Sequence, residues 1–203
     1  GAMMAIAKLR IGVDVIGIIP SAENLPGPNS YRPGDIITTY SGKSVEVQNT
    51  DAEGRMILCD ALHYAKEQKC QVIVDIATLT GACMVALGKY KAGLMGNDDK
   101  IIDSLKRASE KSGEKLWHMP SGEEYFEEMK SKIADLKNIG SKWGGACTAA
   151  AFLGSFVGDT KWAHIDMAGV DMFDSGEKYG SVGATGFGVR LLTSFVKNQA
   201  ESK

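Results

Sequence analysis

The chain has 203 residues, of which 44% are hydrophobic and 24% are charged, and its formal net charge is −2. These values are typical of a globular protein with one well-filled core, and they exclude a disordered, collagen-like or disulfide-scaffold chain. The near balance of acidic and basic side chains argues against nucleic acid as a partner, because binding to phosphates needs an excess of positive charge.

The cysteine spacing and the length of the apolar runs bear on the compartment. The four cysteines form no CxxC pair, and no apolar run approaches the about 18 residues of a membrane span. From these features we expect a protein of the reducing cytoplasm without a membrane partner.

The first third of the chain alternates between strand and helix patterns. Residues 13–19 are rich in β-branched side chains and almost continuously apolar, which is typical of a strand covered on both faces. The other elements expected here are the end of a helix at 2–9, a loop at 20–34, a strand pair at 35–39 and 44–48, an amphipathic helix at 56–69 and a buried strand at 71–77. A strand, a helix and a second strand in this order need a crossover connection. We therefore predict an α/β fold in which a mostly parallel mixed sheet lies between helices, in three α/β/α layers.

The rest of the chain continues the alternation. Helices are expected at residues 101–112, 123–129, 146–156 and 188–197, and a short buried strand at 162–167. Gly113 is placed to end the first of these helices. The sequence shows no internal repeat, so we treat residues 1–203 as one unit.

The strongest candidate for chemistry is the heptapeptide NTDAEGR at residues 49–55, between a strand and the helix that follows it. In a parallel sheet, ligands collect at this end of the strands. Asp51 and Glu53 can converge only on an irregular turn, because residues two apart point to opposite faces of a strand. The two carboxylates either cap the positive end of the helix dipole or act as oxygen ligands of divalent ions such as Mg²⁺, Mn²⁺ or Zn²⁺, and the pattern alone leaves both open.

The same heptapeptide is identical to the signature of the leucine aminopeptidases, and the chain resembles that family along essentially its whole length. Further matching stretches follow in the family's order: YRPGD at 31–35, SG at 41–42, LCDAL at 58–62, DIATLTGA at 75–82, WAHID at 162–166 and GATG at 183–186. The resemblance implies a cytosolic, hexameric exopeptidase that uses two metal ions to remove N-terminal residues, often leucine, from peptides.

The resemblance also implies a role for each matching residue. Asp51 and Glu53 would bind the two divalent ions, Mn²⁺ or Zn²⁺ with Mg²⁺ as a further option, and Glu53 would bridge them. Arg55 would hold a bicarbonate ion that acts as the general base, in keeping with the bidentate fit of a guanidinium to a planar oxyanion. The residues implied to line the substrate pocket are Thr78, Leu79, Gly81 and, on the opposing wall, Ala168.

The chain departs from the family at its beginning. The family's other metal ligands, a lysine and two aspartates, and a second lysine that polarises the scissile carbonyl lie upstream of the helix with which this chain begins, and none of them is present. Two metal ions need on the order of ten donor atoms, and two carboxylates offer far fewer. We therefore expect residues 1–203 to be the C-terminal portion of a metallo-aminopeptidase catalytic domain, beginning inside a helix, with weak metal binding and little activity alone. The alternative is a non-catalytic assembly or binding module built from the same half-domain.

Two weaker signals have ordinary structural explanations. Cys59 and His63 share a helix face at a spacing of four residues, but a small buried thiol on a core-facing helix is the common case. The three histidines lack the HExxH spacing of a zincin. His164 lies in an apolar strand, where we expect a core residue rather than a metal ligand.

Overall fold

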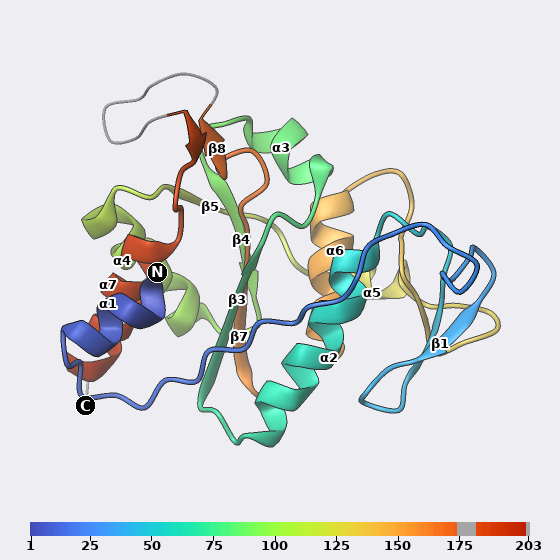
Figure 1. Ribbon diagram of the computed structural model, residues 1–203, viewed down its shortest axis with the longest axis horizontal. Helices are drawn as coiled ribbons and strands as arrows, with labels where there is room; N and C mark the ends of the chain where they lie inside the picture. Colours follow the sequence, from blue (N-terminus) through green and yellow to red (C-terminus); the bar gives the residue numbers. More distant parts are fainter. Residues whose placement is uncertain (174–181, 202–203) are drawn as a thin grey trace.

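The computed structural model describes residues 1–173 and 182–201 and has a four-stranded sheet at its centre (Figure 1). The strands, in their order across the sheet, are β3 (Val72–Ala77), β7 (Lys161–Asp166), β4 (Ala92–Gly96) and β5 (Leu116–His118). β3 pairs with β7 and β4 with β5 in parallel, whereas β4 and β7 are antiparallel. The prediction of a mostly parallel mixed sheet is therefore confirmed.

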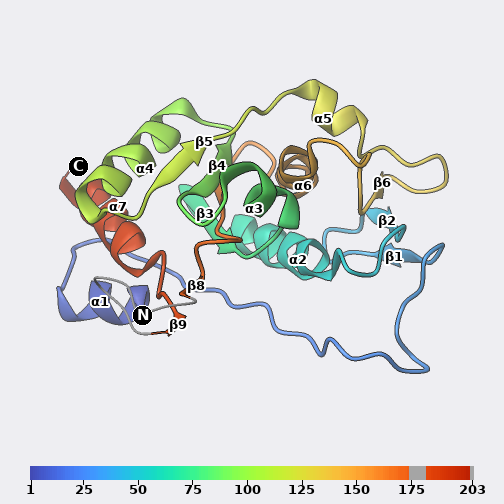
Figure 2. The same ribbon diagram turned by 90° about the horizontal axis from the view of Figure 1, so that it is seen from above.

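Helices cover both faces of this sheet, which gives the three layers expected from the sequence (Figure 2). One face carries α1 (Ala2–Lys8), α4 (Asp99–Ser112) and α7 (Val189–Glu201). The other face carries α2 (Glu53–Glu67), α3 (Gly81–Leu87) and α6 (Gly145–Gly154), and the short α5 (Glu123–Glu127) packs on α6. Across the two described ranges, no helix combines the length and the apolar character that crossing a bilayer requires.

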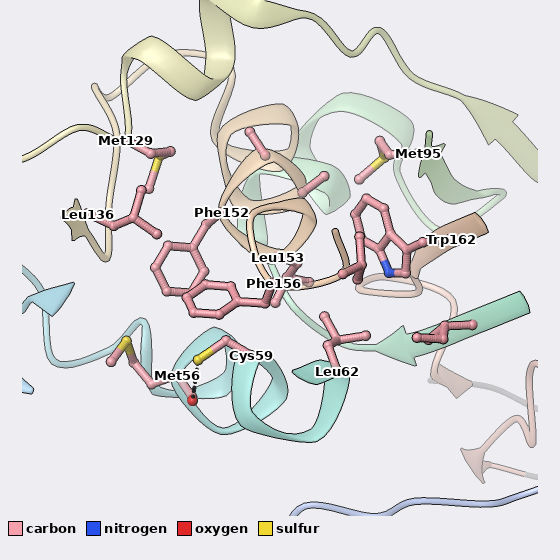
Figure 3. Close-up of a cluster of buried hydrophobic side chains, with 14 of the residues drawn as sticks. Met56, Cys59, Leu62, Met95, Met129, Leu136, Phe152, Leu153, Phe156 and Trp162 are labelled. Atoms are coloured by element: carbon pink, nitrogen blue, oxygen red, sulfur yellow. Dashed lines mark hydrogen bonds between the residues drawn. The ribbon is translucent and has the colours of Figure 1, made fainter. Parts of the chain in front are cut away.

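Strand β7 supplies side chains to the cores on both sides of the sheet, because successive residues of a strand point to opposite faces. Ala163 and Ile165 join the apolar cluster that includes the buried side chains of α4 and α7, whereas Trp162 joins the cluster between the sheet and α2 and α6. In the second cluster the rings of Phe152 and Phe156 lie with their centroids 5.2 Å apart (Figure 3). Each core is built from segments far apart in the chain, so the sheet and its helices stabilise one another.

Helix α4 shows how local sequence sets the ends of an element. The Asp98 carboxylate accepts a hydrogen bond from the backbone N–H of Ile101 at 2.9 Å and so caps the first turn. Gly113 has a φ of +75° and ends the helix in the left-handed conformation that glycine adopts without a Cβ clash. Both the helix and its end at Gly113 agree with the prediction.

Two smaller sheets accompany the central one. The first contains β1 (Ile36–Thr38), β2 (Ser44–Glu46) and β6 (Leu136–Lys137), and the second contains β8 (Met172–Phe173) and β9 (Gly183–Ala184). β1 and β2 are antiparallel, which confirms the predicted strand pair. This hairpin matters for the site because the residues that follow β2 lead directly into α2.

Helix α3 and strand β4 were not predicted. α3 has seven residues, and β4 carries glycine at two of its five positions, so neither shows a hydrophobic period of useful length. Tertiary packing places them: a Cβ at Gly93 would lie 2.9 Å from the Cys83 sulfur, so the two elements approach each other closely only because residue 93 has no side chain.

The predicted buried strand at residues 13–19 is wrong. This segment is extended but belongs to no strand, and Ile16 and Ile19 are 55% and 88% exposed. A strand persists when neighbours satisfy its backbone N–H and C=O groups. Among the described residues, none pairs with the backbone of residues 14–24.

The core assignment predicts a large effect for Phe152→Ala. Phe152 is fully buried, so truncation leaves a cavity and should lower the free energy of unfolding by about 3–5 kcal/mol. The matched control Val85→Ala removes an aliphatic side chain that is 89% exposed and should change it by less than about 0.5 kcal/mol. Urea unfolding followed by circular dichroism measures both; equal losses for the two variants would contradict the assignment.

Candidate functional site

The predicted metal ligands lie where the chain enters α2. Ala52 is the N-cap residue, with φ −99° and ψ 37°, and Glu53 is the first residue of the helix. The side-chain oxygen of Asn49 accepts a hydrogen bond from the backbone N–H of Asp51 at 2.9 Å, which holds the preceding turn. The backbone between the two carboxylates is therefore neither strand nor helix, as the sequence requires for them to converge.

The carboxylates of Asp51 and Glu53 do not cap the helix. The N-cap makes no side-chain hydrogen bond, and within the described part of the chain neither carboxylate accepts a hydrogen bond or joins an ion pair. Asp51 is exposed and Glu53 is half-buried. Of the helix-capping role that the sequence left open, only the favourable interaction of the Glu53 charge with the positive end of the helix dipole remains.

Asn138, which follows β6, fixes the turn from the other side and was missed by the sequence analysis. Its side-chain oxygen accepts hydrogen bonds from the backbone N–H groups of Gln48 and Asn49 at 2.9 and 3.2 Å, and its amide donates to the carbonyl of Asn49 at 2.6 Å. Its own carbonyl accepts a hydrogen bond from Nη1 of Arg55 at 2.8 Å. Asn138 is fully buried, so this clamp is shielded from water.

Arg55 is a buried cation. Its side chain is on α2 and the residue is 7% exposed. Burial lowers the pKa of Arg55 to about 10, while the nearby charges of Asp166 and Glu53 act in the opposite direction. Its Nε has no hydrogen-bond partner among the described residues. A guanidinium held in this way stays charged at neutral pH and has donor capacity left for an anion.

Tyr31 also contacts the turn that precedes α2. Its hydroxyl donates a hydrogen bond to the carbonyl of Thr50 at 3.1 Å. Burial and the charge of Glu53 raise the pKa of Tyr31, which places the phenol near that carboxylate. The YRPGD stretch of the sequence therefore supports the same turn as Asn138.

The carboxylate of Asp166, at the end of β7, organises both walls of the predicted substrate pocket. It accepts hydrogen bonds from the backbone N–H groups of Leu79, Thr80 and Ala168 at 3.0, 3.3 and 3.2 Å and from the Thr80 hydroxyl at 2.6 Å. Asp166 is fully buried. The segment after β3 and the segment after β7 are thereby tied to one point, although they are far apart in the chain.

The turn and the pocket segments adjoin each other. A Cβ at Gly54 would lie 3.5 Å from Cδ1 of Leu79, so the first turn of α2 packs against that side chain. Thr78 and Gly81 are exposed on either side of Leu79 and the buried Thr80. The structure thus brings residues 51–55 close to the carboxyl ends of β3 and β7, where residues 78–81 and Ala168 lie.

A second buried polar group lies further along β3 and β7. Nδ1 of His164 is 2.5 Å from the Asp75 carboxylate, whose other oxygen accepts a hydrogen bond from the indole N–H of Trp162 at 2.7 Å. Burial on its own lowers the pKa of His164, but the charge and hydrogen bond of Asp75 raise it above its ordinary value. His164 is therefore a core residue, as expected, although its Nε2 has no partner among the described residues.

The thiol of Cys59 is not an activated nucleophile. Its sulfur donates to the carbonyl of Met56 at 3.0 Å, and burial raises its pKa, which keeps it protonated. His63 is instead 3.8 Å from the carboxylate of Glu67. The ordinary structural explanation for this pair holds.

The described residues do not build a complete metal site by themselves. Within residues 1–173 and 182–201, no group of three or more His, Cys, Asp or Glu side chains could hold a metal ion. Two hollows of about 500 and 320 Å³ lie between α1, α4 and α7 and beside α5 and α6, away from the pocket segments. The roles of Asp51, Glu53, Arg55 and the pocket residues remain predictions.

Comparison with known proteins gives close relatives. Residues 1–193 match the cytosol aminopeptidase family, catalytic domain. A probable cytosol aminopeptidase of Geobacter sulfurreducens is 56% identical over 197 residues, which are 97% of this chain and 40% of the relative. One of Pasteurella multocida is 51% identical over all of this chain and 40% of its own length. A solved structure of a tomato leucine aminopeptidase mutant has a TM-score of 0.83 at 48% identity and covers 88% of this chain and 34% of that one.

The Asp166 hydrogen bonds predict graded losses of stability. Asp166→Ala leaves one buried and two partly buried N–H groups without an acceptor and should lower the free energy of unfolding by about 3–5 kcal/mol. Asp166→Asn keeps one carbonyl oxygen at this point and should lose clearly less. Urea unfolding gives the energies, and amide hydrogen exchange at residues 79, 80 and 168 should rise in the alanine variant. Unchanged exchange there would show that Asp166 does not hold the two segments.

Proposed function

The chain belongs to the cytosol aminopeptidase family, and from that premise we propose that it forms part of the active site of a metal-dependent aminopeptidase that releases N-terminal, leucine-like residues from peptides. The observation that carries this proposal is the meeting of two groups of residues at one edge of the sheet. Asp51, Glu53 and Arg55 come from the start of α2, and the segments held by Asp166 adjoin them.

Asp51 and Glu53 would hold the metal ions. Two carboxylates that make no hydrogen bond or ion pair with the described residues are the hard oxygen donors that Mn²⁺, Mg²⁺ and Zn²⁺ accept. The donor set fits such ions only in part, because no third metal-binding side chain stands beside the pair in the described ranges. When bound, a pair of divalent ions would supply Lewis-acid activation of water.

Arg55 would bind and orient an anion at this site. Its guanidinium is anchored by the Asn138 carbonyl, so little conformational freedom is lost when an oxyanion docks. Bicarbonate has the planar geometry that a guanidinium matches and can accept a proton from water. This role requires a charged Arg55, and its pKa of about 10 satisfies that requirement at neutral pH.

Thr78, Leu79, Gly81 and Ala168 would bind the N-terminal residue of the peptide. Leu79 offers an apolar side chain, and Gly81 and Ala168 leave room because they are small. Asp166 holds the backbone of both segments, so the width of such a pocket would be set before substrate arrives.

The chain spans about two fifths of the length of the curated relatives that it matches. We propose that the other metal ligands come from the rest of such a longer polypeptide and that the chain alone is almost inactive. We also propose that this longer polypeptide assembles into the hexamer of the family and is located in the cytoplasm. A non-catalytic assembly or binding module is the second candidate, and the incomplete donor set is the observation in its favour.

Metal binding by the isolated chain should be weak and should depend on the two carboxylates. Mn²⁺ titration followed by electron paramagnetic resonance should give a Kd of about 10⁻⁴ M or weaker. The double variant Asp51→Asn, Glu53→Gln should remove this binding. The matched pair Asp103→Asn, Glu110→Gln neutralises two exposed carboxylates of α4 and should leave it unchanged. Equal losses in both double variants would reduce the binding to general charge attraction.

Activity should appear when the rest of the polypeptide is supplied. A chimera in which this chain replaces the matching 40% of the Geobacter sulfurreducens relative should hydrolyse leucine anilide with Mn²⁺, whereas the chain alone should not. Arg55→Lys in the chimera should lower kcat by roughly 100-fold, because an ammonium cannot reproduce bidentate contact with an anion. A folded but inactive chimera would favour the non-catalytic module. Turnover by the chain alone, near that of an intact relative, would refute the half-site proposal.

A further inference from the structure

His164 and Asp75 form a buried pair that the chemistry proposed above does not use. They are register partners on β7 and β3, and Nδ1 of His164 lies 2.5 Å from one oxygen of the Asp75 carboxylate. The other oxygen accepts a hydrogen bond from the indole N–H of Trp162 at 2.7 Å. The carboxylate thus faces a nitrogen on each side, an arrangement that favours a proton on Nδ1 of His164.

The pair is closed to water. His164 is fully buried, and the side chain of Asp75 is 9% exposed. Nε2 of His164 has no hydrogen-bond partner among the described residues. With Nδ1 held by Asp75, Nε2 is the atom at which the imidazole gains or loses its second proton. A proton at Nε2 adds one positive charge to the interior of the protein.

This charge lies in the same layer as Arg55. Residues 162, 164 and 166 of β7 point to one face of the sheet, and Trp162 packs in the cluster between that face and the helices α2 and α6 (Figure 3). Arg55 enters the layer from α2 and is 7% exposed. The charge of Asp166 acts on both Arg55 and His164, and the charge of Arg55 acts on His164. Because the groups are buried, water screens these interactions little.

The surroundings of His164 favour its charged form. Burial on its own lowers the pKa of His164, and so does Arg55, but the charge and hydrogen bond of Asp75 together with the charge of Asp166 raise it above its ordinary value. The buried thiols on the helices of this face are Cys59 of α2, Cys83 of α3 and Cys147 of α6. Burial raises the pKa of each thiol, so they stay uncharged at neutral pH.

We propose that His164, held by Asp75, supplies a second positive charge for the oxyanion at Arg55, so that the affinity of this anion site is set by the protonation of His164. The inference rests on the anion role proposed for Arg55 and names what regulates it. The ligand class is a planar oxyanion with one negative charge, such as bicarbonate. Affinity is high while His164 is protonated and falls as the pH rises through the pKa of His164. Because coupling between two sites is reciprocal, the bound anion also stabilises the protonated imidazole.

Nitrate titration followed by NMR tests the coupling without using activity. Nitrate is planar like bicarbonate and keeps one negative charge at every pH of the experiment. The Nε–H signal of Arg55 reports binding, and the ¹⁵N signals of the His164 imidazole report its protonation. The Kd of nitrate should rise roughly 10-fold as His164 loses its proton. Saturating nitrate should raise the midpoint of the His164 titration by about one pH unit. A Kd that stays constant while His164 titrates would overturn the inference.

Asp75→Asn separates the charge from the structure. Asparagine keeps the size of the side chain and an oxygen that can accept from Trp162, but it has no charge, so His164 should lose its proton at least about one pH unit lower. The fall in nitrate affinity should move by the same amount, which a purely structural effect would not produce. The control Asp103→Asn removes an exposed carboxylate of α4 and should leave the midpoint unchanged. A fall in affinity at the original pH in Asp75→Asn would count against His164.

His164→Gln removes the charge itself. Glutamine can donate to Asp75 but does not titrate, so nitrate should bind roughly 10-fold more weakly at neutral pH and without pH dependence. In the control His118→Gln the affinity should not change, because burial and the charge of Lys106 lower the pKa of His118 and it is already neutral. Unchanged affinity in folded His164→Gln would overturn the inference. Should neither variant at this pair fold, the titration of the original chain decides.

Arg55→Gln distinguishes this inference from the proposed function. Nitrate binding that is lost in this variant is located at Arg55. Nitrate binding at Arg55 that does not respond to His164 would overturn the inference alone and leave the anion role of Arg55 standing. Absence of any nitrate effect on the Arg55 signal in the original chain would overturn both.

Discussion

The buried carboxylate of Asp166 is the constraint on which the candidate site depends. It sits at the end of β7 and accepts hydrogen bonds from Leu79, Thr80 and Ala168. Without a buried acceptor at that point, three backbone N–H groups and the Thr80 hydroxyl would lose their partner where the segments after β3 and β7 meet. The charge is tolerated in the interior because several donors surround it and because the Arg55 cation lies near enough for the charge of Asp166 to act on its pKa.

Near Asp166, the polar side chains that hold the backbone make hydrogen bonds, whereas the side chains of the candidate metal ligands make none with the described residues. Asp166 and Asn138 are buried, and the side chain of each makes several hydrogen bonds to the backbone. The carboxylates of Asp51 and Glu53, by contrast, make no hydrogen bond or ion pair with the described residues. The hydrogen bonds of Asp166 and Asn138 hold the backbone, while the carboxylates of Asp51 and Glu53 make none in the described part of the chain. This arrangement is the one expected of a site that binds a ligand. The hydrogen bonds that hold the backbone are present in the chain, whereas the described residues hold no group of three or more side chains that could bind a metal ion.

The same incompleteness appears in the sheet. Residues 13–19 and β3 both carry backbone groups that no described residue satisfies. The open sheet edge and the short donor set are independent observations, since one concerns the main chain and the other concerns side chains.

The sequence by itself determined the elements with a strong period and the motif at residues 49–55, because local spacing and capping residues such as Gly113 act within one segment. It did not place the motif relative to the central sheet, because β2, the strand that precedes α2, belongs to the separate sheet of β1, β2 and β6 and does not pair with β3. It failed at residues 13–19, where apolar β-branched side chains indicate burial but only a neighbouring strand can provide it. Tertiary structure alone decided the parts played by Asn138 and Asp166: one acceptor serves donors from distant segments, and no sequence period records which segments will meet.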